Sequence, residues 1–594
     1  MLRPISPRLK KCCALAGFAS IFGTTRDERG TKMPKVEYDA IVIGSGITGG
    51  WAAKELTEKG LKVLVLEAGR PIVPERDYVE HVPSWDLKFR GWDRREERER
   101  IQPIQRQVAY ACDEYSSQFF VNDLENPFTT EAGKPFAWIR GRQVGGKSIT
   151  WGRQSYRWSD LDFEANLRDG IAVDWPIRYK DIEPWYDYVE DFAGISGQAE
   201  GLPQLPDSKF LPPMEMNCAE RVVKEAIPKH FDDGRMITIG RTAILTQVHK
   251  GRAACHYCGI CHRGCITSSY FSSLNSTLPA AGKTGRLTIR PYSVVHSLIF
   301  DPATRRVTGA HVIDGQTRQS LEFNAKIVFV CASALESARI LLNSTSPEFP
   351  NGLANSSGQV GRNIMDHAMG GGADGIIPGH ENEVDFGNRP NGIYVPRFRN
   401  VKNKESGFLR GYGFQGGGSR ESWSRGITSP GIGAEFKNAL RRPGAWHFGF
   451  HGFGECLPNP ENYMEINPAQ KDAWGIPTVK INCAFGDNEK ALLKDMSIQA
   501  AEMLTAAGAT EIRPYIDNNP PGLAIHEMGT ARMGRDPKTS VLNAFNQSHD
   551  VKNLFMPDGA CMTSSSCVNP SLTYMALTAR AADYAVSQMK KGEL

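Results

Sequence analysis

Four cysteines lie within eleven residues near the middle of the chain, with the spacing C-x2-C-x2-C-x3-C. They are Cys255, Cys258, Cys261 and Cys265. A tight loop of this spacing can turn several thiolates toward one point, as bacterial ferredoxin-type iron–sulfur sites require. The sequence therefore predicts an iron–sulfur cluster. The ferredoxin pattern continues with proline, but Ile266 follows Cys265, so three or four iron ligands, and a 3Fe–4S or a 4Fe–4S cluster, stay open.

Two other interpretations of this cysteine loop (residues 255–265) stay open. Structural zinc sites use C-x2-C pairs, but usually as two pairs well separated in sequence, and no such pair occurs outside the loop. The four residues are, in the remaining interpretation, ordinary thiols. Thirteen cysteines in 594 residues are too few for a disulfide scaffold, so the scattered ones are expected to be buried, small apolar residues.

A dinucleotide-binding fingerprint begins near residue 38. There an apolar, β-branched run leads into Gly44-x-Gly46-x-x-Gly49 and then into a segment of helical period. The glycines permit a tight turn, close backbone approach to a pyrophosphate and helix–strand contact, with the phosphates at the helix N-terminus. A second apolar run ends in Glu67, at the distance where an acid binds the adenosine ribose and disfavours NADP. A glycine-rich turn in an unrelated α/β protein is the simpler alternative.

Composition restricts the class of protein. A chain of 594 residues exceeds one hydrophobic core, so two domains or one elaborated domain are expected. Hydrophobic residues make up 40% and charged residues 23%, as in ordinary globular proteins. The 70 basic and 66 acidic residues give a net charge of +4, which carries no signature of nucleic-acid binding.

Residues 1–35 are expected to be a leader or an upstream extension from a misassigned start. Four basic residues precede an apolar run at 12–22, which is the outline of a signal peptide. That run is too short to span a bilayer, and no twin arginine precedes it. No other run approaches transmembrane length, and both interpretations of the N-terminus stay open.

Elements that could position a cofactor recur along the chain. A second glycine-rich turn, at Gly145 and Gly146, lets the backbone approach a bound molecule closely. Later strands, and a helix with a serine cap, are predicted from period and turn residues at 286–290, 293–300, 307–312, 327–331 and 333–342. Elements of the nucleotide domain thus return long after the first strand, so the domains are expected to be interleaved.

The last eighty residues carry an ordered set of motifs. His526-Glu-Met-Gly-Thr, then Asp558-Gly559, then Asn569-Pro-Ser resemble the C-terminal block of glucose–methanol–choline (GMC) oxidoreductases. Earlier GMC landmarks fall in order, namely the fingerprint, Val144-Gly-Gly146, Asp174-Trp-Pro-Ile177, Cys331-Ala-Ser and Gly358-Gln-Val-Gly361. The resemblance covers roughly residues 36–590. With its cysteine loop, the chain is similar in pattern to bacterial FAD-dependent sugar dehydrogenases, namely glucose dehydrogenase and the large subunit of glucoside 3-dehydrogenase.

The resemblance implies an α/β fold. In this fold a Rossmann-like FAD-binding domain is interleaved with a sheet-plus-helix substrate domain. The implied FAD-binding domain comprises residues 36–160, 246–375 and 516–594, with a lid-like insertion at 80–130. The implied substrate domain comprises residues 161–245 and 376–515.

The resemblance also implies roles for site residues. His526 matches the GMC catalytic histidine and Asn569 its partner, a pair in which a neutral imidazole takes the hydroxyl proton while an amide holds the same oxygen. Asp558 and Gly559 match the turn near the phosphate–ribityl region of FAD. Thr150 stands where some relatives tether flavin through histidine, so noncovalent FAD is expected. The simpler alternatives are a core histidine and a plain turn.

Together the resemblance and the cysteine loop imply an FAD-dependent dehydrogenase that oxidises a hydroxyl of a sugar or glycoside. Hydride passes to flavin, and electrons leave through the iron–sulfur cluster to an external acceptor. A small companion subunit and a cytochrome are the implied partners, and the periplasm is favoured over the cytoplasm. The rivals are a GMC oxidase that uses oxygen and a non-catalytic flavin redox or electron-transfer protein.

Overall fold

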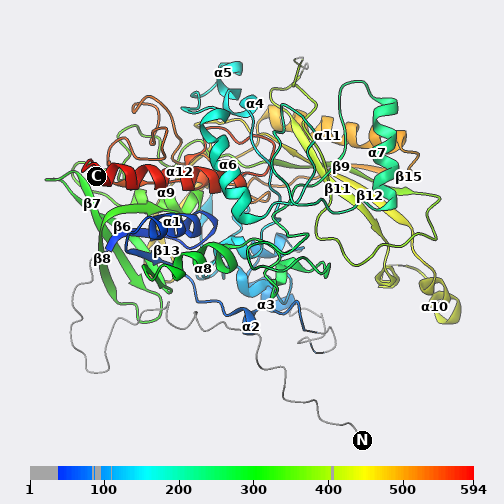
Figure 1. Cartoon of the computed structure of the whole chain (residues 1–594), viewed down its shortest axis with the longest axis horizontal. Coiled ribbons are helices and arrows are strands. Elements are labelled where there is room, and N and C mark those ends of the chain that lie inside the picture. The colour runs from blue at the N-terminus through cyan, green and yellow to red at the C-terminus, as the bar shows by residue number, and fades with distance from the viewer. Residues whose placement is uncertain are drawn as a thin grey trace, which may run out of the picture.

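The structure is a computed structural model, and it describes residues 38–82, 86, 95–108, 110–402, 404, 407–427 and 429–594. The expected leader, residues 1–35, lies outside the described residues. So does part of the expected lid-like insertion, namely 83–85, 87–94 and 109. The described chain has the mixed α/β fold that the sequence predicts (Figure 1).

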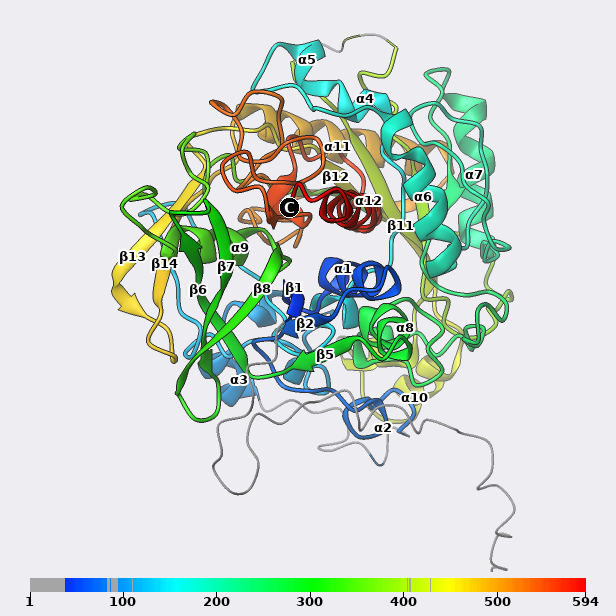
Figure 2. The ribbon, with the colours of Figure 1, turned by 60° about the vertical axis from the view of Figure 1, so that its left-hand side comes forward.

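The first sheet collects strands from three distant parts of the chain (Figure 2). Its order is β5-β2-β1-β8-β7-β6, and β16 pairs with β8. Strands β5, β2, β1, β8 and β16 are parallel, whereas β8, β7 and β6 form an antiparallel meander. The bounds are β1 Tyr38–Ile43, β2 Val63–Leu66, β5 Leu287–Arg290, β6 Ser293–Asp301, β7 Arg306–Asp314, β8 Ser320–Val330 and β16 Leu554–Phe555.

Both faces of this sheet are buried at β1. Ile41 and Ile43 belong to one hydrophobic core, whereas Ala40 and Val42 belong to another. Since side chains alternate along a strand, a run that is apolar throughout must be covered on both sides. Helix α1 (Ile47–Glu58) follows β1 directly and packs beside α12 (Ser571–Lys590), so the start and the end of the described chain meet at the glycine turn (Figures 1 and 2).

A second, antiparallel sheet has the order β15-β9-β12-β11-β10-β4. Helix α11 (Asp487–Ala506) packs on β9, and α7 (Cys218–His230) packs on β11. Phe448 and Phe450 of β12 are fully buried in the core that these helices share with the sheet. The bounds are β4 Thr238–Ile239, β9 Ala368–Ile377, β10 Ile393–Val395, β11 Tyr412–Arg420, β12 Trp446–Gly454 and β15 Thr510–Ile516.

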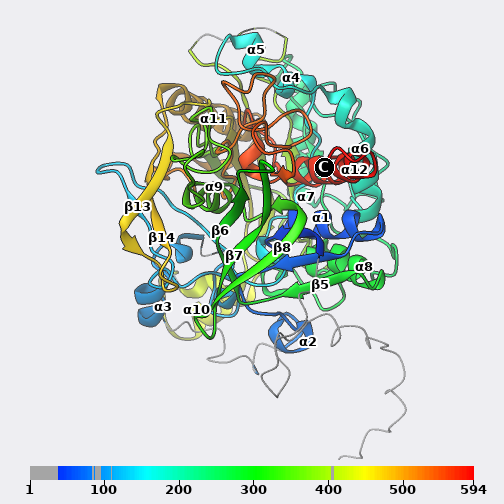
Figure 3. The ribbon, with the colours of Figure 1, turned by 90° about the vertical axis from the view of Figure 1, so that its left-hand side faces the viewer.

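A third, small sheet joins β13 (Tyr463–Lys471), β14 (Pro477–Asn482) and β3 (Thr129–Thr130), at the side of the molecule where Figure 3 shows β13 and β14. The remaining α-helices are α2 Pro74–Asp77, α3 Arg95–Ile101, α4 Asp160–Phe163, α5 Ala165–Asp169, α6 Tyr179–Ala193, α8 Leu278–Lys283, α9 Ala334–Asn343 and α10 Gly433–Arg441. Within the described ranges, no helix combines the length and the apolar character that crossing a membrane demands.

The predicted strands at 286–290, 293–300, 307–312 and 327–331 correspond to β5, β6, β7 and the end of β8. The predicted helix corresponds to α9, and the predicted serine stands at its N-cap position. Ser333 has a φ of 78° and its side chain makes no capping hydrogen bond. Ser337, one turn later, instead accepts the N–H of Ala332 and donates to Asp558, so a contact with a distant segment fixes the start of this helix.

Candidate active site

A cavity of about 700 Å³ lies between the first sheet and the second. The turn after β1 and the end of β2 line one end of it. Side chains of the second sheet line the other end, namely Met369 of β9, Gln415 of β11, and His451 and Phe453 of β12. The cavity is therefore long enough to hold a nucleotide at one end and a substrate at the other.

The predicted fingerprint glycines differ in what they contact. Gly44 has a φ of +93°, and a Cβ there would lie 2.5 Å from the carbonyl oxygen of Cys331. A Cβ at Gly49 would lie 2.0 Å from the carbonyl oxygen of Gly44, so Gly49 brings α1 against the turn and does not line the cavity. A Cβ at Gly46 would meet no protein atom within 4 Å, and Gly46 faces the cavity. The space at Gly46 fits the close approach of a pyrophosphate.

The second glycine turn packs directly on the first. A Cβ at Gly146 would lie 3.0 Å from the Cα atom of Gly46, and Gly146 lines the cavity. Gly145 supports this turn from behind with a φ of +100°, a left-handed conformation that glycine adopts without strain. The backbone N–H of Gly145 donates to the hydroxyl of Ser45 at 3.0 Å, which ties the two turns together.

Glu67 lies at the end of β2, buried on the cavity wall, where the sequence predicts a ribose-binding acid. One carboxylate oxygen accepts the backbone N–H of Ser45 at 3.0 Å and its hydroxyl at 2.5 Å. The other accepts the N–H of Gly69 at 2.8 Å. Burial raises the pKa of Glu67, and these hydrogen bonds oppose the rise. The carboxylate thus fixes the end of β2 against the fingerprint turn.

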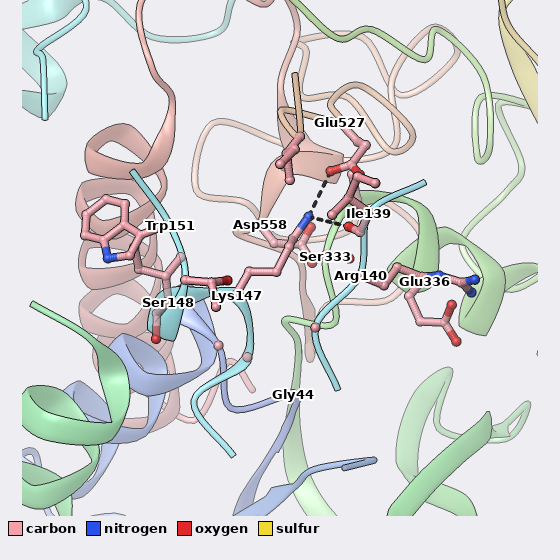
Figure 4. A pocket seen from close by; sticks show the side chains of 18 of the residues that line it. Gly44, Ile139, Arg140, Lys147, Ser148, Trp151, Ser333, Glu336, Glu527 and Asp558 are labelled. Carbon is pink, nitrogen blue, oxygen red and sulfur yellow. Dashed lines mark hydrogen bonds and ion pairs between the residues drawn. The ribbon is translucent and has the colours of Figure 1, made fainter. Parts of the chain in front are cut away.

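Figure 4 shows charged side chains of both signs on one wall of the cavity, with Lys147 and Arg140 near the acids Glu336, Glu527 and Asp558. Nζ of Lys147 donates to Glu527 at 3.1 Å and to the carbonyl oxygen of Ile139 at 3.4 Å (Figure 4). Arg142 also lines the cavity, and its buried Nε and Nη2 atoms have no hydrogen-bond partner among the described residues. Because buried donors are rarely left unpaired, this wall fits an anionic group such as the pyrophosphate of FAD.

Asp558 and Gly559 both line the cavity. The carboxylate of Asp558 accepts the hydroxyl of Ser337 at 2.5 Å and the N–H of Ala560 at 3.0 Å. Burial raises the pKa of Asp558 to about 6, and these hydrogen bonds oppose the rise. A Cβ at Gly559 would lie 2.5 Å from the carbonyl oxygen of Glu527, so the backbone passes here in close contact with the segment that carries His526.

The turn before His526 is held by the buried carboxylate of Asp366. Its oxygens accept the backbone N–H groups of Gly522 at 2.7 Å, Ala524 at 3.1 Å and His526 at 3.0 Å. Ile525, within this turn, has a φ of +65°, which is rare for a β-branched residue. Such strain persists only where neighbouring contacts enforce it. Asp366 therefore fixes the direction in which the His526 imidazole points.

Hydrogen bonds to His367 assign the tautomer of His526. Nε2 of His367 lies 3.1 Å from the carbonyl oxygen of Ser565, so it must donate. The other nitrogen of a neutral His367, Nδ1, is then an acceptor, and it lies 2.9 Å from Nδ1 of His526. His526 must donate from Nδ1, which leaves its Nε2 with a free lone pair. Burial lowers the pKa of His526 well below its usual range, so this imidazole is neutral at pH 7.

Asn569 lies on the other side of the same imidazole. Its Oδ1 accepts from Nε2 of Gln415 at 2.7 Å, so its Nδ2 is directed at Nε2 of His526, at 3.4 Å. This orientation agrees with an unprotonated Nε2 on His526. Both predicted residues line the cavity, at the end formed by the second sheet.

The cysteine loop lies outside the cavity lining. Backbone N–H groups approach two of its sulfurs, that of Tyr257 to Cys255 at 3.4 Å and that of Ser269 to Cys265 at 3.3 Å. A tetrahedral zinc site with Zn–S bonds of about 2.3 Å needs sulfurs about 3.8 Å apart. No three of the loop's sulfurs, all in described residues, lie within 4.8 Å of one another. The thiols of the described loop are therefore not arranged as a closed tetrahedral zinc site.

The other cysteines of the described chain behave as the composition predicts. None forms a disulfide, and those outside the loop are all buried: Cys112, Cys218, Cys331, Cys456, Cys483, Cys561 and Cys567.

The residues that sequence reasoning missed are the partners of those that it found. Asp366 and His367 directly follow the motif that begins at Gly358, but no local pattern tells that they face the turn before His526. Lys147 lies next to a predicted glycine, and Gln415 lies in a glycine-rich strand. Only the pairing of distant segments reveals what these four side chains contact.

Comparison with known proteins matches most of the chain to one family. Two family models described as GMC oxidoreductase match residues 38–369 and 458–578. The chain is 31% identical over 560 residues to 2-methyl-1,2-propanediol dehydrogenase of Mycolicibacterium austroafricanum, covering 92% of this chain and 94% of that protein. It is 28% identical over 570 residues to the fructose dehydrogenase large subunit of Gluconobacter japonicus, covering 93% and 98%.

A solved structure agrees in fold. Pyridoxine 4-oxidase from Mesorbium loti superposes with a TM-score of 0.56 and 18% sequence identity, covering 92% of this chain and 98% of that one. At this identity the likeness concerns the fold alone.

Gly46→Val is expected to fold but to bind no flavin, because its Cβ meets no protein atom within 4 Å and the side chain fills the space that the pyrophosphate needs. The flavin absorbance per purified chain and the melting temperature together test this. Gly49→Val is the matched control, since its Cβ would collide with the backbone of Gly44 and should destabilise the fold itself. Wild-type flavin content in Gly46→Val would contradict the assignment.

Proposed function

We propose, from the premise that this chain belongs to the GMC oxidoreductase family, that it is an FAD-dependent dehydrogenase of a sugar or glycoside hydroxyl. The family acts on the CH–OH group of alcohols or sugars. The observation that carries the proposal is the neutral His526, whose Nε2 lone pair faces the cavity beside Asn569.

The proposed chemistry needs a base and an orienting group. Bound FAD would accept hydride from the carbon that carries the hydroxyl. His526 takes the hydroxyl proton at Nε2, because its Nδ1 proton is held by His367. Asn569 donates from Nδ2, and its position beside Nε2 lets it hold the same substrate oxygen. Gln415 positions this amide by donating to its oxygen.

The proposed cofactor site uses the glycine turns and the charged wall. Gly46 leaves room for the pyrophosphate, and Gly44 and Gly146 allow the close packing of the two turns around it. Glu67 accepts hydrogen bonds from the ribose, and the guanidinium of Arg142 offers positive charge. A covalent link through the side chain that follows the second glycine turn is not expected, because Thr150 offers no imidazole there. FAD is therefore proposed to bind noncovalently.

The proposed exit for electrons is an iron–sulfur cluster held by Cys255, Cys258, Cys261 and Cys265. The C-x2-C-x2-C-x3-C spacing and the backbone N–H groups directed at two of the sulfurs support this assignment. Such a cluster would pass electrons one at a time to an external carrier. We propose a cytochrome acceptor and a small companion subunit in the periplasm. The name of one relative, a large subunit, supports the companion subunit.

A small diol is a second candidate substrate. The relative with 31% identity is named for 2-methyl-1,2-propanediol, which carries adjacent hydroxyl groups as sugars do. The substrate end of the cavity offers polar groups on Gln415 and His451 together with the apolar Met369 and Phe453, and this mixture suits either class. An anaerobic screen of sugars, glycosides and diols for bleaching of bound flavin separates the two candidates.

His526→Ala is expected to keep its flavin and to lose about 10² to 10⁴ in the rate of flavin reduction, the range for a positioned acid–base group. Anaerobic stopped-flow absorbance measures this rate. Asn569→Ala should lose less, because it orients the substrate and takes no proton. His549→Ala, whose imidazole contacts Ser540 and does not line the cavity, is the control. Near-wild-type reduction by His526→Ala would refute its role as the base.

His367→Phe is expected to slow flavin reduction about tenfold to a hundredfold. The His526 Nδ1–H then has no acceptor, and an unpartnered buried donor costs about 1–3 kcal/mol. His367→Gln offers an amide oxygen in the same region and should recover part of the rate. The comparison of the two variants by stopped flow, at equal flavin content, isolates the hydrogen bond. Equal rates for both variants would show that His367 does not set the tautomer.

Changing Cys258 or Cys261 to Ser is expected to remove iron and to leave flavin reduction by substrate largely intact. Reduction of an added cytochrome should be lost, because the proposed exit is gone. Iron analysis, flavin bleaching and cytochrome reduction are measured on the same preparations. Cys483→Ser, a buried thiol outside the loop, is the control. The assignment fails if the purified wild-type protein contains zinc and no iron.

A further inference from the structure

A buried arginine without an acidic partner lies at the cavity wall. Arg153 lines the cavity and is only 8% exposed. Its Nε and Nη1 atoms have no hydrogen-bond partner, and within the part of the chain that the structure describes it forms no ion pair. Because burying an unpaired cation is strongly unfavourable, such a side chain points to an anionic group that would complete the site.

The backbone of Arg153 is also strained. Its φ of 61° lies in the left-handed region, which non-glycine residues seldom occupy. Three hydrogen bonds to its carbonyl oxygen hold this conformation, from the N–H of Ala243 at 2.9 Å, the hydroxyl of Ser155 at 3.0 Å and that of Thr242 at 3.2 Å. Strain that is enforced in this way gathers at functional sites. These contacts therefore fix the backbone conformation that sets the direction of the Arg153 side chain.

The guanidinium of Arg153 is directed at the cysteine loop. It lies 5.1 Å from the ring centroid of Tyr270, a buried residue that packs in one cluster with Cys261 and Cys265. The hydroxyl of Tyr270 donates at 2.7 Å to the carbonyl oxygen of Ile149, beside the cavity. One cation thus lies between the cavity and the cluster of side chains that includes Cys261 and Cys265.

A second buried arginine lies near the loop. Arg252 is 8% exposed and donates only to neutral groups, namely Ser276 at 3.2 Å and the carbonyl oxygen of Ala193. Burial lowers its pKa to about 10, and the neighbouring Cys265 opposes this shift. Unlike Arg153, it does not line the cavity.

Two acids lie beside the loop. Asp113 pairs with Arg263 at 2.7 Å and with His262 at 3.1 Å. Glu80 accepts the backbone N–H of Ile266 with one oxygen, and its other oxygen has no hydrogen-bond partner among the described residues. Neither acid pairs with Arg153 or Arg252 in the described chain, and a thiolate-ligated metal cluster, which is anionic, would complement these two arginines.

We propose that Arg153 is an electrostatic positioning residue between the cofactor cavity and the cysteine loop, and that its charge raises the reduction potential of the metal group bound by the loop. This inference rests on the proposed function. Reduction adds negative charge to a cluster that is already anionic, so a fixed positive charge nearby stabilises the reduced form. Because Arg153 also lines the cavity, its charge acts on the potential of bound flavin in the same direction.

Arg153→Gln and Arg153→Lys test the proposal in the holoenzyme loaded with flavin and iron. Iron and flavin per chain are measured first, and the midpoint potentials of the metal centre and of flavin follow from an anaerobic redox titration read by EPR and absorbance. Arg153→Gln should make reduction of the metal centre about tenfold less favourable, which is about 59 mV for one electron. Arg153→Lys keeps the charge and should stay close to wild type.

Two further arginine variants serve as controls. Arg252→Gln should lower the potential of the metal centre and leave that of flavin unchanged, because Arg252 does not reach the cavity. Arg168→Gln, which removes an exposed arginine paired with Glu164 on the helix surface, should change neither potential.

Each possible result either supports or overturns the proposed role of Arg153. An unchanged metal potential in Arg153→Gln with full iron overturns the inference and leaves the proposed function standing. A shift of the flavin potential alone also overturns it, since Arg153 would then serve only the cofactor. Loss of iron from both Arg153 variants indicates a structural role and overturns it, whereas loss from Gln but not from Lys supports it. A wild-type protein without iron overturns it together with the cluster of the proposed function.

Discussion

The carboxylate of Asp366 holds the backbone of residues 522–526 in place, and the geometry of the catalytic end of the cavity depends on this contact. Three N–H groups converge on one buried carboxylate, including that of His526. Burial raises the pKa of Asp366 to about 7, whereas the hydrogen bonds favour the charged form. The left-handed Ile525 stays in its strained conformation because these bonds offset its cost. The imidazole of His526 is therefore positioned before any ligand binds.

The cavity lies between the first sheet and the second, and residues of both sheets line it. The fingerprint turn and the Asp558 segment meet because β1 and β16 both pair with β8 in one sheet. The second glycine turn joins them by packing directly on the fingerprint turn, through Ser45 and Gly46. The second sheet contributes Gln415, which orients Asn569. A neutral histidine and hydrogen-bonded amides thus lie at the substrate end, while glycine turns and the buried Glu67 lie at the nucleotide end. This division suits a nucleotide cofactor and a neutral hydroxyl substrate.

Local patterns were enough to predict the strands at β5–β8 and the places of Gly46 and Glu67 on the cavity, because glycine turns and strand ends have short sequence signatures. The fold class and the places of His526 and Asn569 on the cavity came from the resemblance to a family. Ser333 stands at the N-cap of α9 as predicted, but its side chain makes no capping hydrogen bond, and Ser337 links that helix start to Asp558 instead. His367 could not be predicted, because its effect on His526 depends on a carbonyl group about two hundred residues away. That the buried Arg153 lacks an acidic partner in the described chain could also be recognised only in the folded structure.

The central claim is that electrons leave the reduced protein through the cysteine loop and not to oxygen. The most direct measurement reduces the holoenzyme anaerobically with substrate and then mixes it with either air-saturated buffer or an oxidised cytochrome, following flavin reoxidation in both. The account predicts that reoxidation by the cytochrome is much faster, with little hydrogen peroxide formed in air. Faster reoxidation by oxygen, with one hydrogen peroxide formed per flavin, would contradict it and identify an oxidase.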